Sequence, residues 1–198
     1  MVLASQSPRR IGLMSGAGYT FDVVPADIDE TALPHEHPIE LVGRLSALKA
    51  AHVAELPATA AGEVVIAADT IVALGDELLG KPRDAADARR MLRELSGRTH
   101  QVATGVAIVR AASGAAAPEA LAAFTEVTDV TFFDLSDTEI DAYVASGEPM
   151  DKAGSYGVQG AGGRMLVRGI DGDFYNVVGL PIARVARALR GLGILPGV

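Results

Sequence analysis

Apolar residues follow two different patterns along this chain, and each pattern predicts one kind of secondary structure. Residues 64–74, Val-Val-Ile-Ala-Ala-Asp-Thr-Ile-Val-Ala-Leu, are almost continuously apolar, which is typical of a strand covered on both faces of a sheet. After Pro38 the apolar residues recur every three or four positions, which predicts a helix to about residue 56. The apolar stripe of this helix consists of Leu41, Val42, Leu45, Leu48 and Leu56.

The same patterns, together with helix caps and turn residues, place the other elements. Ser7 and Asp84 stand at helix N-cap positions, and Ser136 with Glu139 forms a capping box. Asp171-Gly172 predicts a type I′ turn between two strands. The further helices are expected at about 8–17, 85–96, 136–147 and 181–190, and the further strands at about 1–4, 20–25, 99–110, 121–133, 164–170 and 173–178.

The order of these elements predicts the fold class. Strands and helices alternate early in the chain, whereas hairpins dominate later, so the sheet should be mixed. The alanine-rich residues 111–119 are expected to form the loop of one hairpin. We expect an α/β protein with a long mixed sheet, flanking helices and a cleft between two lobes. Residues 1–198 would then form a single domain whose two lobes share the central sheet.

Composition narrows the class of protein. The 198 residues are 49% hydrophobic and 21% charged, which suits a folded domain with a large core. The absence of cysteine excludes disulfides, thiolate catalysis and Cys-ligated zinc. The first residues lack the pattern of a secretory signal, and no uncharged apolar stretch approaches the ~18 residues that span a bilayer. We therefore expect a cytoplasmic protein without a membrane partner.

Net charge and the choice of basic residue bear on the ligand. A net charge of −8 argues against binding to nucleic-acid polymers, whose affinity depends on neutralised phosphates, but it allows a small phosphorylated substrate. The basic residues are fourteen arginines and only three lysines, Lys49, Lys81 and Lys152. Either these positions require a compact ammonium instead of a planar guanidinium, or they reflect a compositional bias. Both interpretations remain open at this point.

The first candidate site is the start of the helix at 8–17. Helix N-termini carry unpaired N–H groups and partial positive charge, so their first turn usually contains acidic residues. Here the first turn contains Arg9 and Arg10. An anion held by the N–H groups, the hydroxyls of Ser5 and Ser7 and the two guanidinium groups would resolve this conflict. The alternative is a capped surface helix with solvated arginines.

The second candidate site is Asp69, the only charged residue of the apolar strand at 64–74. An unpaired buried carboxylate costs several kcal/mol, so we expect a metal ion, a lysine or a position facing a cleft to offset that cost. An aspartate bonded to a neighbouring loop is the structural alternative. Glu30, in the acidic loop 27–30, is the second carboxylate for a hard cation such as Mg²⁺.

Two lysines are candidates for contact with a ligand. Lys49 follows Leu45 by four positions and lies within the apolar stripe, so its ammonium either reaches solvent or meets a partner at the floor of a cleft. Lys81 ends a segment with the G-x-x-x-x-G-K spacing of a P-loop. Pro82 then replaces the required Ser or Thr and disfavours the helix that a P-loop begins. Lys81 is therefore interpreted as a loop lysine in reach of phosphate.

The last candidate site is the glycine-dense segment 151–160. Glycines at this density allow the backbone to approach a ligand closely, and the side chain of Gln159 offers both a donor and an acceptor. The segment lacks the preceding strand and following helix of a dinucleotide-binding fingerprint. It is either a ligand-binding loop or a flexible loop tip.

Six motifs stand in a fixed order along the chain. They are Leu-Ala-Ser-Gln-Ser-Pro-Arg-Arg at 3–10, Ala-Asp-Thr-Ile-Val at 68–72, Gly-Lys-Pro at 80–82, Leu-Ser-Gly-Arg-Thr-His-Gln-Val at 95–102, Ser-Gly-Glu-Pro-Met-Asp-Lys-Ala-Gly-Ser-Tyr-Gly-Val-Gln-Gly at 146–160 and Val-Val-Gly-Leu-Pro at 177–181. With these motifs the sequence resembles the Maf family of nucleoside triphosphate pyrophosphatases, and the resemblance runs from residue 3 to about residue 190.

The resemblance implies a fold like that of the inosine triphosphate pyrophosphatases, often dimeric, with a cleft for a nucleotide and a divalent metal, Mg²⁺ or Mn²⁺. Asp69 matches the catalytic carboxylate, usually described as the base, and with Glu30 it would bind the metal. The phosphate-binding positions match Ser5, Arg9, Arg10, Lys49 and Lys81. The positions linked to substrate choice match Arg9, Thr70 and Gln159.

The implied reaction is hydrolysis of a nucleoside triphosphate to the monophosphate and pyrophosphate. The family has a dTTP/UTP branch and a 7-methyl-GTP branch, and the latter typically carries Glu at the position of Gln159. The motifs of this chain resemble the former, which implies dTTP, UTP and modified pyrimidine nucleotides as substrates. Two alternatives remain: a 7-methyl-GTP pyrophosphatase, and a nucleotide-responsive regulator of septum formation, after which the family is named.

Overall fold

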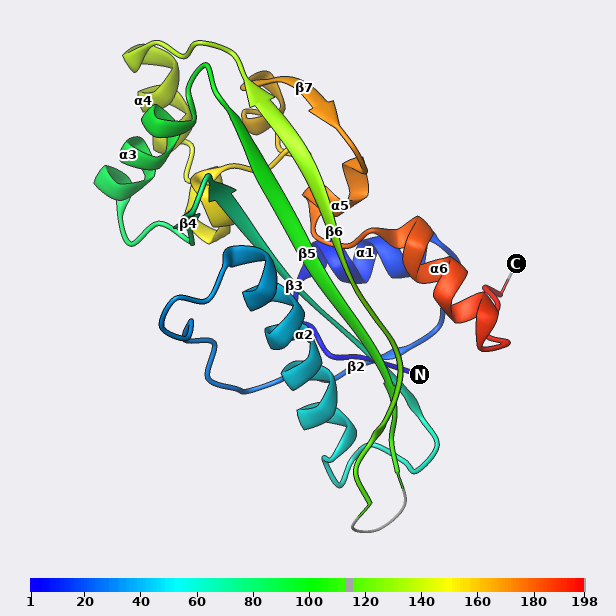
Figure 1. Ribbon diagram of the computed structural model, residues 1–198. Helices are drawn as coiled ribbons and strands as arrows, with labels where there is room; N and C mark the ends of the chain where they lie inside the picture. Colours follow the sequence, from blue (N-terminus) through cyan, green and yellow to red (C-terminus); the bar gives the residue numbers. More distant parts are fainter. Residues whose placement is uncertain (113–115, 198) are drawn as a thin grey trace. The chain divides into compact units, whose positions relative to one another are not determined.

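The computed structural model describes residues 1–112 and 116–197 (Figure 1). The chain forms two compact units. Unit 1 consists of Met1–Asp69, Thr104–Glu126 and Gly179–Val198, and unit 2 of Thr70–Ala103 and Val127–Val178. None of the helices in the described ranges has the length and apolarity that a membrane crossing requires.

Within the described residues, seven strands form one sheet in the order β2-β1-β3-β5-β6-β7, with β4 paired to β3. Strand β1 is parallel to β2 and β3, whereas β4 is antiparallel to β3 and β7 is antiparallel to β6. The prediction of an α/β protein with a mixed sheet is therefore confirmed. The strands are β1 (Val2–Leu3), β2 (Asp22–Val23), β3 (Val64–Leu74), β4 (Glu77–Leu79), β5 (Thr99–Arg110), β6 (Glu119–Phe132) and β7 (Val167–Asp171).

Strands β5 and β6 are neighbours in the sheet, as the predicted hairpin requires. Residues 113–115 of its predicted loop lie outside the described residues.

Helices cover two faces of the strands in unit 1 (Figure 1). They are α1 (Pro8–Gly16), α2 (Pro38–Ala54) and α6 (Ile182–Gly191). On β3, Ile66 and Ala68 belong to a core shared with α1 and α6, whereas Val65 and Ala67 belong to a core shared with α2. Because side chains alternate along a strand, Asp69 lies on the face that α2 covers.

The predicted stripe of α2 is correct for Leu41, Val42 and Leu45, which are buried, and wrong for Leu48, which is 44% exposed. At ~100° per residue, the buried positions of α2 centre near Lys49, and Leu48 falls beyond their edge. A lysine therefore occupies the middle of a helix face that packs on the sheet.

Unit 2 contains two helices that pack on each other, α3 and α4, and several short turns (Figure 1). Its helical elements are α3 (Ala85–Leu95), α4 (Asp137–Ala145), η1 (Glu148–Asp151), η2 (Ala153–Ser155), η3 (Gly163–Met165) and α5 (Phe174–Val178). Both predicted caps are confirmed: Asp84 accepts a hydrogen bond from its helix, and Ser136 and Glu139 cap each other's backbone. Leu92 and Phe132 are fully buried in the hydrophobic core of this unit.

The second strand of the hairpin predicted at Asp171-Gly172 is instead the helix α5. The Asp173 carboxylate accepts hydrogen bonds from the N–H groups of Tyr175, at 2.7 Å, and Asn176, at 3.4 Å, which caps a helical turn. The turn buries Asn176, whose Nδ2 donates to Val102 O at 2.9 Å and to Thr128 Oγ1 at 3.0 Å. This local cap and the buried amide outweigh the strand propensity of the aromatic and β-branched residues.

Candidate active site

Asp69, Lys49 and Glu30 form the charged cluster of unit 1. Lys49 Nζ donates a hydrogen bond to Asp69 Oδ1 at 2.6 Å and lies 2.8 Å from Glu30 Oε1. Lys49 and Asp69 are 8% and 9% exposed, whereas the side chain of Glu30 is 56% exposed. Of the two expectations for Lys49, contact with a partner is confirmed and escape to solvent is wrong, whereas the position of that partner at the floor of a cleft stays a prediction.

This cluster offsets the cost of burying Asp69. A buried carboxylate needs a charged partner or several hydrogen bonds, and Lys49 supplies the charge at contact distance. One ammonium meets two carboxylates here, so negative charge remains in excess among the three groups. Within residues 1–112 and 116–197, Asp69 Oδ2 makes no hydrogen bond, which leaves that oxygen available for a proton or a cation.

Arg10 adds a second cation from the first turn of α1. Its Nε donates to Gly179 O at 2.8 Å, and its Nη1 donates to Ser5 Oγ at 3.3 Å. Burial lowers the pKa of Arg10, the carboxylate of Asp69 raises it, and the guanidinium of Arg9 lowers it. The structure thus brings the start of α1 into electrostatic contact with the charged cluster.

The helix α1 begins at Pro8, as predicted, after Ser7 at the N-cap. The Ser7 hydroxyl makes no capping hydrogen bond, and the first turn contains no acidic residue. Ser7 instead donates its backbone N–H to Ser5 Oγ at 3.2 Å. The partial positive charge of the helix N-terminus and two arginines therefore act together, with Ser5 ordering the backbone before them. Binding of an anion there stays a prediction.

The carboxylates of Asp69 and Glu30 fit a divalent cation of the Mg²⁺ class whose other ligands are substrate phosphates and water. No group of three or more His, Asp or Glu side chains in the described parts of the chain is arranged to hold a metal. Magnesium is commonly bound by one or two carboxylates together with substrate phosphates and water. Two oxygen donors beside Lys49 match that class, and they do not match a preformed cage of protein ligands.

Three predicted residues belong to unit 2: Thr70, Lys81 and Gln159. Thr70 follows Asp69 on β3, so alternation turns its side chain to the opposite face. Lys81 is exposed and no helix begins there, which confirms that its segment is not a P-loop. Gln159 is also exposed, and its side-chain amide makes no hydrogen bond among the described residues. Their participation in one site with Asp69 stays a prediction.

Sequence reasoning missed the carbonyl of Gly179, which accepts the hydrogen bond that orients Arg10. A backbone acceptor has no signature in residue type. The available signal was the Val-Val-Gly-Leu-Pro motif at 177–181, in which Gly179 adopts a φ of 124° that other residues rarely reach.

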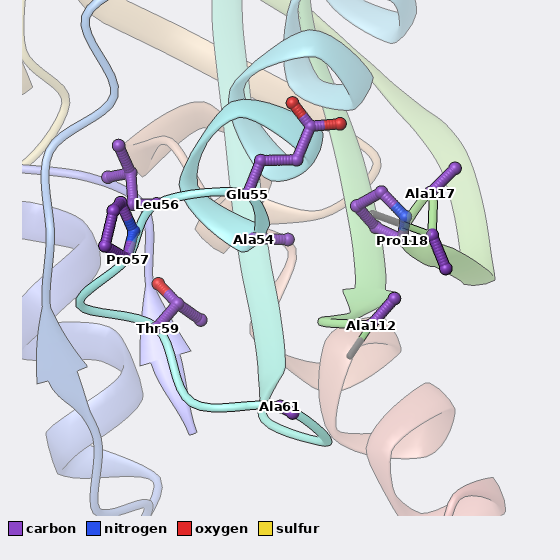
Figure 2. Close-up of a pocket in the computed structure, with 10 residues that line it drawn as sticks. Ala54, Glu55, Leu56, Pro57, Thr59, Ala61, Ala112, Ala117 and Pro118 are labelled. Carbon is purple, nitrogen blue, oxygen red and sulfur yellow. The ribbon is translucent and has the colours of Figure 1, made fainter. Parts of the chain in front are cut away.

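A pocket of about 530 Å³ lies elsewhere in unit 1 (Figure 2). Eight of its ten lining residues have apolar side chains, and Glu55 is its one charged residue in the described ranges. The lining residues are Ala54, Glu55, Leu56, Pro57, Thr59, Ala61, Ala112, Ala116, Ala117 and Pro118. None of the predicted site residues belongs to it.

The chain is similar to one family of proteins and to several known proteins. Residues 1–192 match the family described as Maf-like protein. The dTTP/UTP pyrophosphatase of Anaeromyxobacter dehalogenans (strain 2CP-C) is 52% identical over 194 residues, which cover 98% of this chain and 94% of the relative. The dTTP/UTP pyrophosphatase of Bacillus cytotoxicus (strain DSM 22905 / CIP 110041 / 391-98 / NVH 391-98) is 47% identical over 189 residues, 96% and 93% of the two chains. The solved structure of a HAM1 protein from Coxiella burnetii matches 66% of this chain and 71% of that chain, with a TM-score of 0.44 and 19% identity.

Proposed function

Because the chain belongs to the Maf family, we propose that it hydrolyses dTTP, UTP and modified pyrimidine nucleoside triphosphates to the monophosphate and pyrophosphate. The relatives named dTTP/UTP pyrophosphatase align over almost the whole chain, which supports this choice of substrates. The observation that carries the proposal is the charged cluster, in which a buried carboxylate lies against a lysine and in electrostatic contact with the partly buried Arg10.

In the proposed reaction, a water oxygen attacks a phosphorus of the triphosphate chain and the P–O bond to the leaving pyrophosphate breaks. Asp69 Oδ2 accepts the proton of the water as general base. Lys49 holds Asp69 through the other carboxylate oxygen, so the ammonium orients the base. Lys49, Arg10 and Arg9 supply preorganised positive charge for the phosphate oxygens, on which negative charge develops.

We include a divalent metal, Mg²⁺ or Mn²⁺, in the proposal. Asp69 and Glu30 would hold it together with phosphate oxygens of the substrate. When bound, such an ion polarises phosphoryl oxygens and lowers the pKa of a bound water. In the alternative assignment Asp69 serves only as a ligand of the metal. The two assignments predict different results for the Asp69→Asn variant. If Asp69 is only a metal ligand, excess metal should restore turnover; if Asp69 is the general base, it should not.

The deciding experiment is a panel of nucleoside triphosphates with Mg²⁺ or Mn²⁺, followed by separate measurement of pyrophosphate and orthophosphate. We expect pyrophosphate from dTTP and UTP. Asp69→Asn should lower turnover at least ~100-fold. Asp87→Asn is the matched control, because Asp87 is also a buried, ion-paired carboxylate but belongs to α3. Release of orthophosphate, or no turnover of dTTP and UTP, would refute the proposal.

Substrate choice is assigned to Gln159, whose amide matches the adjacent carbonyl and N3–H of a pyrimidine base. Gln159→Glu removes the donor half of that match. The variant should therefore lose more activity toward dTTP and UTP than toward 7-methyl-GTP in the same panel. An unchanged preference would remove Gln159 from base recognition.

A further inference from the structure

Residues 157–163 of unit 2, called here the glycine loop, are fixed by one carboxylate. Glu148 Oε2 accepts a hydrogen bond from the N–H of Gly162 at 3.1 Å. Glu148 Oε1 accepts one from the N–H of Gly163 at 3.2 Å and another from the Tyr143 hydroxyl at 3.0 Å. A single side chain therefore binds the far end of the loop and a residue of the neighbouring helix α4.

The near end of the glycine loop is held by the same group of residues. The Tyr143 hydroxyl accepts a hydrogen bond from the N–H of Gly157 at 3.2 Å. Lys152 Nζ donates to the backbone carbonyl of Glu148 at 2.5 Å and to Asp151 Oδ1 at 2.6 Å. Both acceptors of Lys152 belong to η1, and the methylene groups of the same side chain lie against Gly157, where a Cβ atom would come within 2.6 Å of Lys152 Cε.

The density of glycine in the loop has a steric cause. A Cβ atom at Gly160 would overlap the Glu148 carboxylate, and one at Gly162 would overlap the ring of Tyr143. The loop backbone can reach Glu148 only because these side chains are absent. This finding favours a shaped loop over the flexible tip that the sequence left open.

The electrostatics agree with this geometry. Burial raises the pKa of Glu148, but the N–H of Gly162, the hydroxyl of Tyr143, the N–H of Gly163 and the charge of Lys152 lower it, and the net pKa lies below its ordinary value. The carboxylate is therefore ionised at neutral pH and accepts from all three donors.

We propose that Glu148 is a positioning residue that fixes the glycine loop and, through it, the side chain of Gln159 that reads the base. This inference rests on the proposed function. Gln159 lies inside the loop, between the residues whose N–H groups Tyr143 and Glu148 bind. Its backbone carbonyl accepts a hydrogen bond from Arg164 Nη2 at 2.8 Å, and its side chain stays exposed. Both ends of the loop and the carbonyls of Gln159 and Gly160 are held by hydrogen bonds, which is how a rigid loop presents one side chain to a ligand.

The test uses Glu148→Gln, which keeps the shape of the side chain but replaces one acceptor oxygen by a donor that faces an N–H. We expect the KM for dTTP to rise about tenfold with kcat changed less than about twofold. Selectivity for dTTP over dATP, the ratio of their kcat/KM values, should fall about tenfold. Amide hydrogen exchange of Gly162 and Gly163 should also become faster, which reports on the loop independently of activity.

Glu139→Gln is the control, because Glu139 likewise accepts from a backbone N–H and a hydroxyl, but at the cap of α4. It should leave the selectivity unchanged. In a Gln159→Ala background, Glu148→Gln should alter the selectivity less than about twofold, since both changes remove the same recognition. An unchanged selectivity in Glu148→Gln, or an equal change with and without Gln159, would overturn the inference.

Failure of the proposed function gives a different result from failure of this inference. If the wild-type protein hydrolyses neither dTTP nor UTP, the proposed function is wrong. The selectivity is then measured between the triphosphate that it does hydrolyse best and the next best in the panel. Loss of that preference in Glu148→Gln still supports the positioning role, and its retention still refutes it.

Discussion

His100 makes the stability of this protein depend on pH in a way that can be worked out in advance. Its imidazole is 2% exposed and packs edge-on against Phe132 and Tyr156, with ring centroids 5.0 and 5.3 Å away. His100 Nε2 lies 2.8 Å from the Tyr156 hydroxyl, and His100 Nδ1 has no hydrogen-bond partner in the described residues. Burial lowers the pKa of His100 from 6.5 to about 4.

The size of the effect follows from the difference between the two pKa values. The folded state keeps His100 neutral down to about pH 4, whereas the unfolded chain binds the proton from pH 6.5 downward. Stability is therefore complete above pH 6.5 and falls by ~1.4 kcal/mol per pH unit as the pH drops toward 4, which is about 3 kcal/mol in all. Below pH 4 the two states bind the proton alike and the loss stops.

His100→Gln removes the titrating group and keeps a polar atom near the Tyr156 hydroxyl. Urea unfolding followed by circular dichroism at several pH values gives the free energy of unfolding of both proteins. The wild-type value minus the variant value should shrink by about 3 kcal/mol between pH 7 and pH 4.

A difference that stays constant over this range would refute the argument. Tyr156→Phe is the control: it deletes the hydrogen-bonding hydroxyl but leaves the imidazole buried, so the slope with pH should persist. NMR titration of the His100 ring measures the low pKa directly.

Three further predictions concern the site and the core. Arg10→Lys should lower turnover about tenfold or more in steady-state kinetics, because Arg10 donates from two separate nitrogens, Nε to the carbonyl of Gly179 and Nη1 to the hydroxyl of Ser5, and the single nitrogen of lysine does not span the same two positions. Asn176→Asp should lower the free energy of unfolding by about 3 kcal/mol or more in urea titrations, since an unpaired carboxylate would face the backbone carbonyl that now accepts the amide. Saturating Mg²⁺ should raise the melting temperature of the wild-type protein but not that of Asp69→Asn, and equal shifts would argue against a metal at this carboxylate.

Elements with a local cause were predictable from the sequence. The strand at 64–74 has the predicted bounds, because its near-continuous apolar run rich in valine and isoleucine is typical of a strand covered on both faces. The caps at Asp84 and Ser136 also depend only on neighbours within three residues. Residues 173–178 were predicted wrongly because a partner far along the chain decides their structure: Asn176 bonds to the carbonyl of Val102.

The charged cluster was predictable in part, and for a physical reason. A strand and a helix each carry one charged residue, Asp69 and Lys49, on a face that is otherwise apolar. Two opposite charges buried in one core lower their cost by meeting. Hydrogen bonds to the backbone could not be predicted from the sequence. The carbonyl that accepts from Arg10 and the N–H groups that donate to Glu148 are present in every residue, so no residue type marks them.

The structure also offers a reason why lysine, and not arginine, stands at positions 49 and 152. Lys49 Nζ lies 2.6 Å from one carboxylate and 2.8 Å from another, and Lys152 Nζ lies 2.5 Å from a backbone carbonyl and 2.6 Å from a carboxylate. In both places one small atom donates in diverging directions. A guanidinium spreads its donors over a plane and needs more room. This geometry favours lysine over arginine at both positions.

Lys49→Arg tests this argument, because it keeps the charge and changes only the shape of the donor. Overpacking of the buried face of α2 should lower the free energy of unfolding by about 1–3 kcal/mol. Turnover should also fall, since Asp69 loses the contact that orients it. Lys81→Arg is the matched control: Lys81 is exposed, so its variant should keep the stability of the wild-type protein. If Lys49→Arg unfolds and turns over like the wild type, charge alone suffices and the choice of lysine is a bias of composition.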